Sequence, residues 1–216
     1  MRSASYSPKE SKAEKFGNFV AKQIRENKTR FLTIIGFVIG LLFFSIFIYM
    51  RFQTIESSAS DRLSAAYMFF ASGDRNQALS YLNDTISLFP KTPSAYQARL
   101  VAGDYFIEES KYDEALPYLQ TAYEKAKPEN MRPLALVRII YLYDLKKDYE
   151  KAILYSNEFI NKYDGNYLIK DVYMNLARFY ILSGLPEDAK RIYNDVLIKF
   201  PATNEAAKAE ENLKNF

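Results

Sequence analysis

The side chains that most often carry out chemistry in proteins are scarce in this chain. Its 216 residues include no histidine and no cysteine, so the commonest metal ligand and general base is missing, and no thiol can act as a nucleophile. Adjacent carboxylates occur at Glu108 and Glu109 and again at Glu210 and Glu211, but neighbouring residues on a helix point about 100° apart and cannot share a site. There is no glycine-rich phosphate loop either. The sequence predicts a protein that is not an enzyme and has no catalytic, cofactor-binding or metal site.

A spacing with a different physical meaning is the G-x-x-x-G pattern of Gly36 and Gly40. Two glycines four residues apart lie on one helix face and let two helix backbones approach closely in lipid. The pattern is common in membrane helices, so two interpretations remain open. The glycines either pack against a partner helix, including that of a second copy in a homodimer, or have no role in packing.

These glycines lie in a run of twenty residues without a charge, FLTIIGFVIGLLFFSIFIYM, at positions 31–50. As a helix with a rise of about 1.5 Å per residue, the run is about 30 Å long, which matches the hydrocarbon core of a bilayer. The alternative is a cleaved signal peptide, whose apolar part has only about 7–15 residues behind a short leader. Because thirty residues precede this run, we expect one transmembrane helix over residues 31–50, followed by a tether over residues 51–57.

The distribution of charge predicts the orientation of that helix. Residues 1–30 contain eight basic and three acidic side chains, whereas the chain from Phe31 onward contains 21 basic and 23 acidic ones. By the positive-inside rule, the basic segment 1–30 stays in the cytoplasm and residues 58–216 form a periplasmic or other extracytoplasmic domain of a single-pass inner-membrane protein. Since the excess of basic residues is confined to this topology signal, no nucleic-acid partner is expected.

The basic segment has a helical periodicity of its own. Its apolar residues recur at helical spacing with basic residues between them, and two interpretations are open. The segment is either a helix that lies on the anionic cytoplasmic leaflet or a charged flank that only fixes the topology. The residues are Phe16, Phe19, Val20 and Ile24 on the apolar face and Lys15, Lys22, Arg25 and Lys28 on the rest.

Beyond the tether, the chain repeats itself every 37 residues. Alanine occupies one column four times, an aromatic residue precedes each alanine by nine positions, and two further columns hold large apolar residues. Each unit has two stretches of helical periodicity separated by a polar break, which predicts a helical hairpin. The columns are Ala78, Ala115, Ala152 and Ala189; Phe69, Phe106, Tyr143 and Tyr180; Ile86, Tyr123, Ile160 and Leu197; and Tyr81, Tyr118, Tyr155 and Ile192.

Other positions mark the ends of the hairpins and one irregular unit. Pro90 and Pro201 should end the second helix of the first and fourth hairpins, because proline has no amide donor to continue the ladder. In the third unit Ile140 replaces a small residue, Ser156 a large one and Phe159 an alanine. We expect that hairpin to splay or to cross at a different angle.

This order of small residue, aromatic, alanine, large residue and terminal proline resembles the tetratricopeptide repeat (TPR), from about Ser58 to Pro201. The period is longer than the usual repeat of about 34 residues. Ala206, Ala209, Leu213 and Phe216 then form the stripe of a capping helix, which terminal repeats need. The predicted fold is all-α, with one N-terminal transmembrane helix followed by an α-solenoid of about four TPR-like helical hairpins and a C-terminal capping helix.

The TPR resemblance implies that the first helices of the hairpins line a concave groove for a peptide or helix. The alternative is that several of these residues pack on the neighbouring repeat. TPR domains that clamp the C-terminal carboxylate of cytosolic chaperones use lysine and asparagine at these columns, and this chain lacks them. The predicted groove residues are Leu63, Tyr67, Phe70, Leu100, Asp104, Ile107, Val137, Tyr141, Asp144, Met174, Arg178 and Ile181.

The order of basic segment, membrane helix and exported repeats resembles the YfgM-type envelope TPR proteins, which are ancillary partners of the bacterial SecYEG translocon. This resemblance implies a membrane-anchored protein–protein interaction scaffold that links the translocon or periplasmic chaperones to exported polypeptides. The alternative is a structural adaptor in an envelope-assembly complex of the outer membrane, cell wall or division machinery. A mitochondrial import receptor would place the repeats in the cytosol, which the basic flank argues against.

Overall fold

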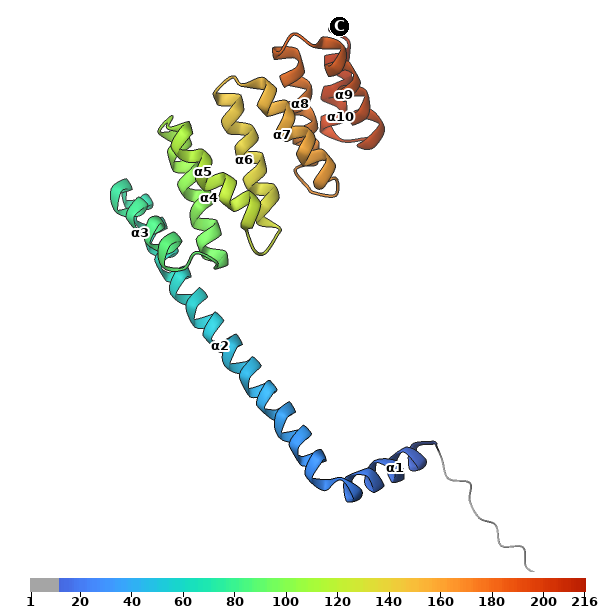
Figure 1. The fold of residues 1–216 in the computed structure, drawn as a ribbon. Helices are drawn as coiled ribbons and strands as arrows, with labels where there is room; N and C mark the ends of the chain where they lie inside the picture. The colour runs from blue at the N-terminus through green and yellow to red at the C-terminus, as the bar shows by residue number, and fades with distance from the viewer. Residues whose placement is uncertain (1–11) are drawn as a thin grey trace, which may run out of the picture. The chain divides into compact units, whose positions relative to one another are not determined.

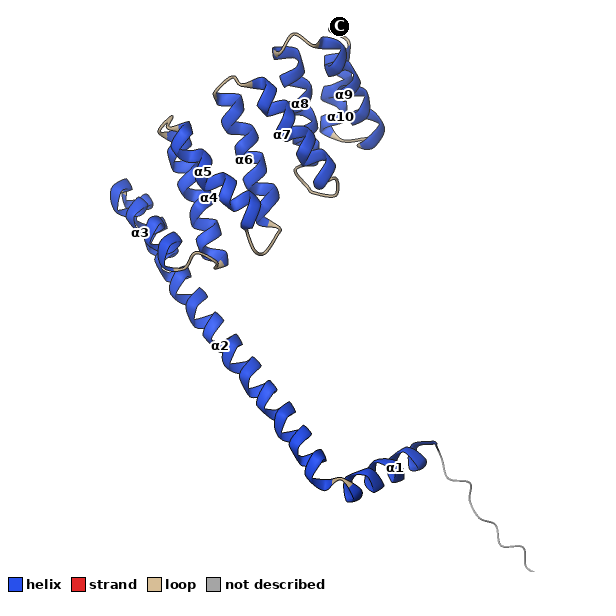
Figure 2. Cartoon of the chain, in the orientation of Figure 1, coloured by secondary structure: helices blue, strands red, loops and turns tan. Residues whose placement is uncertain are grey.

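The chain is described here by a computed structural model that covers residues 12–216, apart from the side chains of residues 12, 13, 23, 24 and 26. Residues 1–11 of the predicted cytoplasmic segment and the side chain of Ile24 therefore lie outside the description. Residues 12–216 form ten helices and no strand (Figure 2), as the sequence predicts. The chain divides into two compact units, with the boundary after Thr54.

The first unit contains α1 (Lys12–Glu26) and the beginning of α2 (Lys28–Ser72). Asn27 alone separates the two helices, and its carbonyl accepts a hydrogen bond from Phe31 N–H at 3.0 Å. In the apolar run, residues 32–50 are all exposed. Residues 51–57, the predicted tether, are helical and belong to α2. Nothing between Met50 and Ser58 stops a helix, since this stretch contains neither proline nor glycine.

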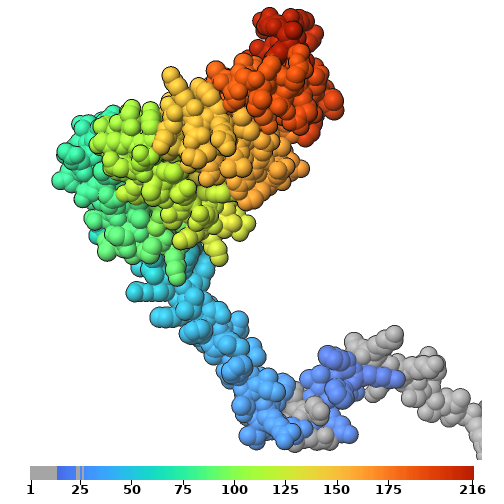
Figure 3. Space-filling model, turned by 45° about the horizontal axis from the view of Figure 1, so that its top comes forward, coloured from blue at the N-terminus to red at the C-terminus, as the bar shows by residue number. Residues whose placement is uncertain are grey.

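The second unit is a series of helical hairpins. The end of α2 pairs with α3, α4 with α5, α6 with α7 and α8 with α9, and α10 covers α9 and α8 (Figure 1). The space-filling view shows the side chains of successive hairpins in continuous contact (Figure 3). The helices are α3 (Arg75–Leu88), α4 (Pro93–Glu108), α5 (Tyr112–Lys125), α6 (Met131–Leu145), α7 (Tyr149–Lys162), α8 (Ile169–Leu182), α9 (Pro186–Lys199) and α10 (Asn204–Leu213).

The turn inside each hairpin has the same backbone geometry in all four repeats. Gly73, Ser110, Lys147 and Gly184 stand 37 residues apart, with φ of 85°, 60°, 58° and 74°. In the second turn, Ser110 N–H donates to the Ile107 carbonyl and the next N–H donates to the Phe106 carbonyl. This pair of bonds is a Schellman motif, which needs one left-handed residue. The 37-residue period thus extends to the backbone conformation. All four turns contain a residue with positive φ, and in two of them that residue is not glycine.

The repeat columns form the interior of the hairpins. Ala78, Ala115, Ala152 and Ala189 all have no exposed surface, so each second helix approaches its partner without a side chain in the way. The aromatic columns stack on each other in the first three hairpins, with ring centroids 5.2 to 5.6 Å apart. The stacked pairs are Phe69 with Tyr81, Phe106 with Tyr118, and Tyr143 with Tyr155.

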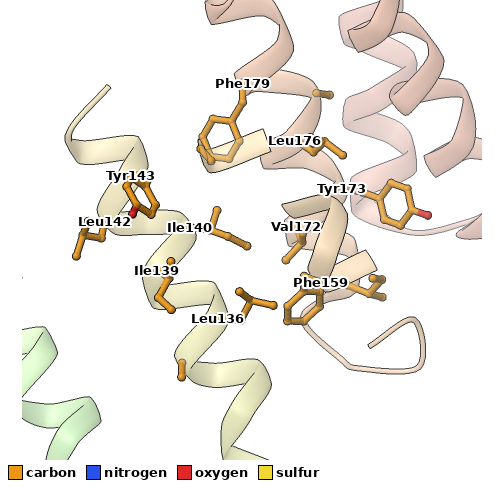
Figure 4. Close-up of a cluster of buried hydrophobic side chains, with 14 of the residues drawn as sticks. Leu136, Ile139, Ile140, Leu142, Tyr143, Phe159, Val172, Tyr173, Leu176 and Phe179 are labelled. Carbon is orange, nitrogen blue, oxygen red and sulfur yellow. The ribbon is translucent and has the colours of Figure 1, made fainter. Parts of the chain in front are cut away.

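In the third hairpin, a large side chain three residues further along α7 replaces the one that is missing at Ser156. Ser156 and Phe159 are both fully buried, and Phe159 lies in one apolar cluster with Leu136 and Val172 (Figure 4). Residues three apart share a helix face, so Phe159 supplies the volume that Ser156 gives up. The different crossing angle of this hairpin remains a prediction.

Threonine caps the helices that follow the first and fourth hairpins. α3 ends two residues before Pro90, and the side chain of Thr92 then accepts a hydrogen bond from Ala95 N–H at 3.2 Å. Thr203 caps α10 in the same way after Pro201, so both prolines lie where the sequence predicts. The start of α4 is also bonded to α2. The carboxylate of Glu56 on α2 accepts hydrogen bonds from the N–H and the Oγ of Ser94, at 3.2 and 2.7 Å.

Candidate functional site: the face of the first helices

Three hollows follow one another along the first helices of the hairpins. One lies between the end of α2 and α4, one between α4 and α6, and one between α6 and α8. The first two share Asp104 and Glu108, and the last two share Tyr141. They therefore adjoin, and we call the three together the A-face groove.

The hollow between α6 and α8 has an apolar floor. Ile140, Val172 and Phe179 line it and are themselves nearly fully buried, with 4%, 3% and 1% exposure. Tyr141 stands at its edge and is 52% exposed. The cavity volume is about 410 Å³, which is the size of a pocket for a few side chains rather than for a whole domain. Ile140 occupies the column where the other repeats carry a small residue, so the irregular unit contributes directly to this floor.

The hollow between α2 and α4 is aromatic. The rings of Phe70 and Tyr105 lie with centroids 5.9 Å apart, and both line the hollow. Across the same pair of helices, Gln97 Nε2 donates a hydrogen bond to the hydroxyl of Tyr67 at 3.1 Å. Arg75 at the start of α3 closes one end, where its guanidinium lies 2.9 Å from the Glu109 carboxylate.

Two carboxylate–arginine bridges cross the groove. Arg138 Nε on α6 donates to both carboxylate oxygens of Asp104 on α4, at 2.7 and 2.9 Å. Arg178 on α8 forms a two-point contact with Asp144 on α6, at 3.1 and 2.6 Å. Both bridges are partly open to solvent, so each contributes at most about 1 kcal/mol to stability. Their main effect is that Asp104 and Asp144 are already neutralised by arginines of the protein itself.

At the rim near the turns, Lys146 and Asp113 make a further contact between hairpins. Lys146 Nζ lies 2.6 Å from Asp113 Oδ1. The hydrogen bond from the ammonium group holds the pKa of the Asp113 carboxyl below its usual range. The groove thus combines an apolar floor between α6 and α8 and an aromatic hollow between α2 and α4 with charge pairs between them, and Glu108 and Asp171 add acidic side chains to the lining. It can bind a partner chiefly by shape and apolar contact.

The structure brings together eight of the twelve predicted groove residues as lining of the hollows. Two others, Leu63 and Leu100, are only 5% exposed and pack in the interior instead. Met174 packs against the main core cluster, and Ile181 is exposed but lines none of these hollows. The eight lining residues are Tyr67, Phe70, Asp104, Ile107, Val137, Tyr141, Asp144 and Arg178.

Several lining residues were missed because they lie one position along from the predicted stripe. On α4 they are Val101, Tyr105 and Glu108, and on α8 they are Asn175 and Phe179. One residue along a helix turns the side chain by about 100°. Residues assigned to the groove from the repeat resemblance can therefore be wrong by one position, which is a rotation of about 100° about the helix axis. The helical stripe through Val101, Tyr105 and Glu108 was the available signal.

The apolar part of α2 shows what a membrane helix requires by length and composition. Among the described residues 12–216, α2 is the one helix long and apolar enough to cross a membrane, and the apolar window is not buried by other parts of the chain. A signal sequence near an N-terminus passes the same test. Gly36 and Gly40 have no neighbouring atom within 4 Å of a Cβ position, so their role in helix packing remains a prediction. In the part of the chain whose side chains are described, no group of three acidic residues could hold a metal ion.

Successive helical hairpins with a groove along their first helices define an α-solenoid of the protein-binding repeat class. The comparison with protein families identifies which one. This chain belongs to the tetratricopeptide repeat-like domain family, whose model matches residues 26–209. No curated protein sequence matches the chain.

Solved structures agree with this fold. A tetratricopeptide repeat protein from Parabacteroides merdae has a TM-score of 0.60 at 18% identity, over 73% of this chain and 59% of that one. The chain thus spans about three fifths of that protein's length. MamA of AMB-1 has a TM-score of 0.52 at 19% identity, over 69% of this chain and 77% of that one. A putative kinesin light chain with TPR-like repeats from Podospora anserina has a TM-score of 0.55 at 14% identity, over 73% and 84%. At these identities the likeness shows the fold alone.

Proposed function

We propose that this chain is a membrane-anchored scaffold that holds a segment of another protein in the A-face groove. The observation that carries the proposal is that the three hollows adjoin one another along the first helices of four successive hairpins. A groove of adjoining hollows, one with an apolar floor and one with aromatic walls, suits an extended peptide or an amphipathic helix that places apolar side chains in them. The TPR family membership supports the same class of function.

The membrane anchor is supported by exposure. Residues 32–50 are exposed without exception, and leaving one large apolar side chain in water instead of burying it costs about 1.5–3 kcal/mol. A bilayer removes that cost for the whole run at once. The family match begins at residue 26 and therefore includes the run together with the repeats, which favours a retained anchor over a removable leader.

The orientation and the partners follow from charge and resemblance. Eight basic and three acidic residues precede the run, which favours a cytoplasmic N-terminus and a periplasmic repeat domain in the inner membrane. In this arrangement the groove faces exported polypeptides. The partners we propose are the translocon, a periplasmic chaperone, or the exported chains themselves, as in the YfgM-type envelope proteins.

A second candidate is a structural adaptor in an envelope-assembly complex. It is favoured by apolar side chains on the second helices of the hairpins, away from the groove. Leu154 on α7 is 61% exposed and Ile198 on α9 is 78% exposed. An adaptor that joins two proteins needs such a second contact surface, whereas a protein that only captures a segment in its groove does not.

Photocrosslinking in living cells separates the two. A photoreactive amino acid is placed in the full chain at Tyr141 in the groove or at Leu154 on the second-helix face, which is exposed to a similar extent. Adducts with translocon, chaperone or exported polypeptides from Tyr141 alone support the scaffold. Adducts with envelope-assembly proteins from Leu154 support the adaptor, and no protein adduct from Tyr141 refutes use of the groove. A third probe at Gly40 tests contact between α2 and other membrane helices.

The orientation has a test of its own. A periplasm-dependent reporter is fused after Phe216, and the expected result is reporter activity together with membrane retention after alkaline washing. Activity in the cytoplasm would overturn the orientation. A released, shortened chain would show that the apolar run is a cleaved signal rather than an anchor.

A further inference from the structure

The helix α1 carries a surface that nothing in the described part of the chain covers. Phe16 is 70% exposed and Phe19 is 62% exposed. Lys15, Lys22 and Arg25 are exposed as well. At helical spacing Lys15 and Lys22 flank Phe19, and Arg25 lies on the far side of the helix. α1 is therefore a helix with an aromatic face and a basic face.

The basic face is part of a wider accumulation of charge. Residues 12–30 contain six basic and two acidic side chains, a strong excess for nineteen residues. Such an excess is attracted to an anionic surface, and the attraction weakens as salt is added. The repeats from Ile55 onward show no comparable excess, because their basic and acidic residues are nearly balanced.

The position of α1 in the chain restricts what can cover its aromatic face. Only Asn27 separates α1 from α2, and the apolar run begins at Phe31. The three steps from Lys28 to Phe31 advance a helix by only about 5 Å. If the run crosses a bilayer, the end of α1 at Glu26 lies at the level of the lipid headgroups.

The stability of an isolated helix points to the same surface. A helix of 15 residues is marginal in water when nothing packs against it. Insertion of an aromatic face at a bilayer interface supplies the missing contact, and long basic side chains reach back to the phosphates. A bilayer surface beside the anchor satisfies the aromatic face, the basic face and the short connection together.

We propose that α1 lies in the headgroup layer of an anionic phospholipid leaflet, with Phe16 and Phe19 inserted toward the acyl chains and the basic face in contact with lipid phosphates. The inference rests on the proposed membrane anchor and goes beyond it. It assigns to α1 a binding surface for anionic lipid that the anchor alone does not need. A protein partner or a second copy on the same face is the competing outcome of the test.

The chain offers a clean probe because it contains no tryptophan. The full chain carrying Phe19→Trp, as its single tryptophan, is reconstituted into vesicles of phosphatidylethanolamine and phosphatidylglycerol that contain lipids brominated on the acyl chains. The matched control is Asn18→Trp, one position along α1 and on the basic side of the helix. We expect the fluorescence of the Phe19→Trp variant to be blue-shifted and quenched at least two-fold more strongly than that of the control.

Lipid charge and membrane insertion are tested separately. The difference in quenching should fall when phosphatidylglycerol is replaced by phosphatidylcholine, and also when salt is raised. An unchanged difference would refute recognition of anionic lipid. Equal quenching of the two variants would refute insertion, and a blue shift without quenching would show that protein rather than lipid covers the face. Flotation of the vesicles after an alkaline wash reports the anchor independently, so retained protein without the α1 signal overturns this inference and leaves the anchor standing.

Discussion

Replacement of Gly103 with alanine tests the close approach of α4 and α5. A Cβ at Gly103 would lie 2.4 Å from Leu119 Cδ2 and 2.7 Å from Leu119 Cγ, whereas carbon atoms in contact normally lie about 3.5–4.0 Å apart. Rotation of the leucine cannot move its Cγ far, and Leu119 has no exposed surface. Overpacking of this kind costs about 1–3 kcal/mol, and alanine regains about 1 kcal/mol of helix propensity. We expect Gly103→Ala to lower the free energy of unfolding by up to about 2 kcal/mol.

The assay is thermal unfolding of the full chain in detergent micelles, followed by circular dichroism. A loss of 1 kcal/mol lowers Tm by roughly 2–4 °C for a domain of this size. The decisive comparison repeats Gly103→Ala in a Leu119→Ala background, where the clashing atoms are gone and the new methyl group partly fills the cavity. There the substitution should be neutral or stabilising. An equal loss of stability in both backgrounds would refute the steric reasoning.

Three further predictions concern a turn, a cap and a partly buried hydroxyl. Lys147→Gly should raise stability by about 1 kcal/mol, since glycine has no Cβ to disfavour the left-handed conformation, and Lys147→Ala should show no such gain in the same melting assay. Thr92→Ala should cost about 1 kcal/mol and Thr92→Ser much less, because serine keeps the oxygen that caps α4; chemical denaturation measures both. Burial, followed by the hydrogen bond to Glu158, raises the pKa of Tyr123 to about 12. Its contribution to stability is therefore complete below pH 10 and lost as the pH rises toward 12, and unfolding of Tyr123→Phe over that range should depend less on pH than that of the unchanged chain.

The hairpins could be predicted from the sequence because each column has one dominant physical cause. Close approach requires a small residue, so Ala115 and its equivalents have no exposed surface, and a proline such as Pro90 marks the end of a helix. The left-handed turn was harder to see. Its column reads Gly73, Ser110, Lys147 and Gly184, and a serine or lysine gives no sign that its backbone takes the conformation of its glycine counterparts.

The groove was predicted less accurately, for a reason of geometry. Leu100 was expected at the surface and is buried, while Val101 lines a hollow. Which of two neighbouring residues faces outward depends on how far each helix is rotated against the next hairpin, and that rotation is set by packing between units. The helical conformation of the tether has a local reason. The thickness of the bilayer limits how many residues cross it, but it does not end the helix. The helix α2 continues to Ser72, where Gly73 ends it with a positive φ.

The carboxylate–arginine bridges have a consequence for how such a protein can change over evolutionary time. Each bridge joins one first helix only to the next, Asp104 to Arg138 and Asp144 to Arg178. A substitution that loosens one bridge should therefore widen the hollow between those two helices and leave the other hollows unchanged. Preference for a new partner can then be acquired one hollow at a time, while the remaining hollows still bind the original partner.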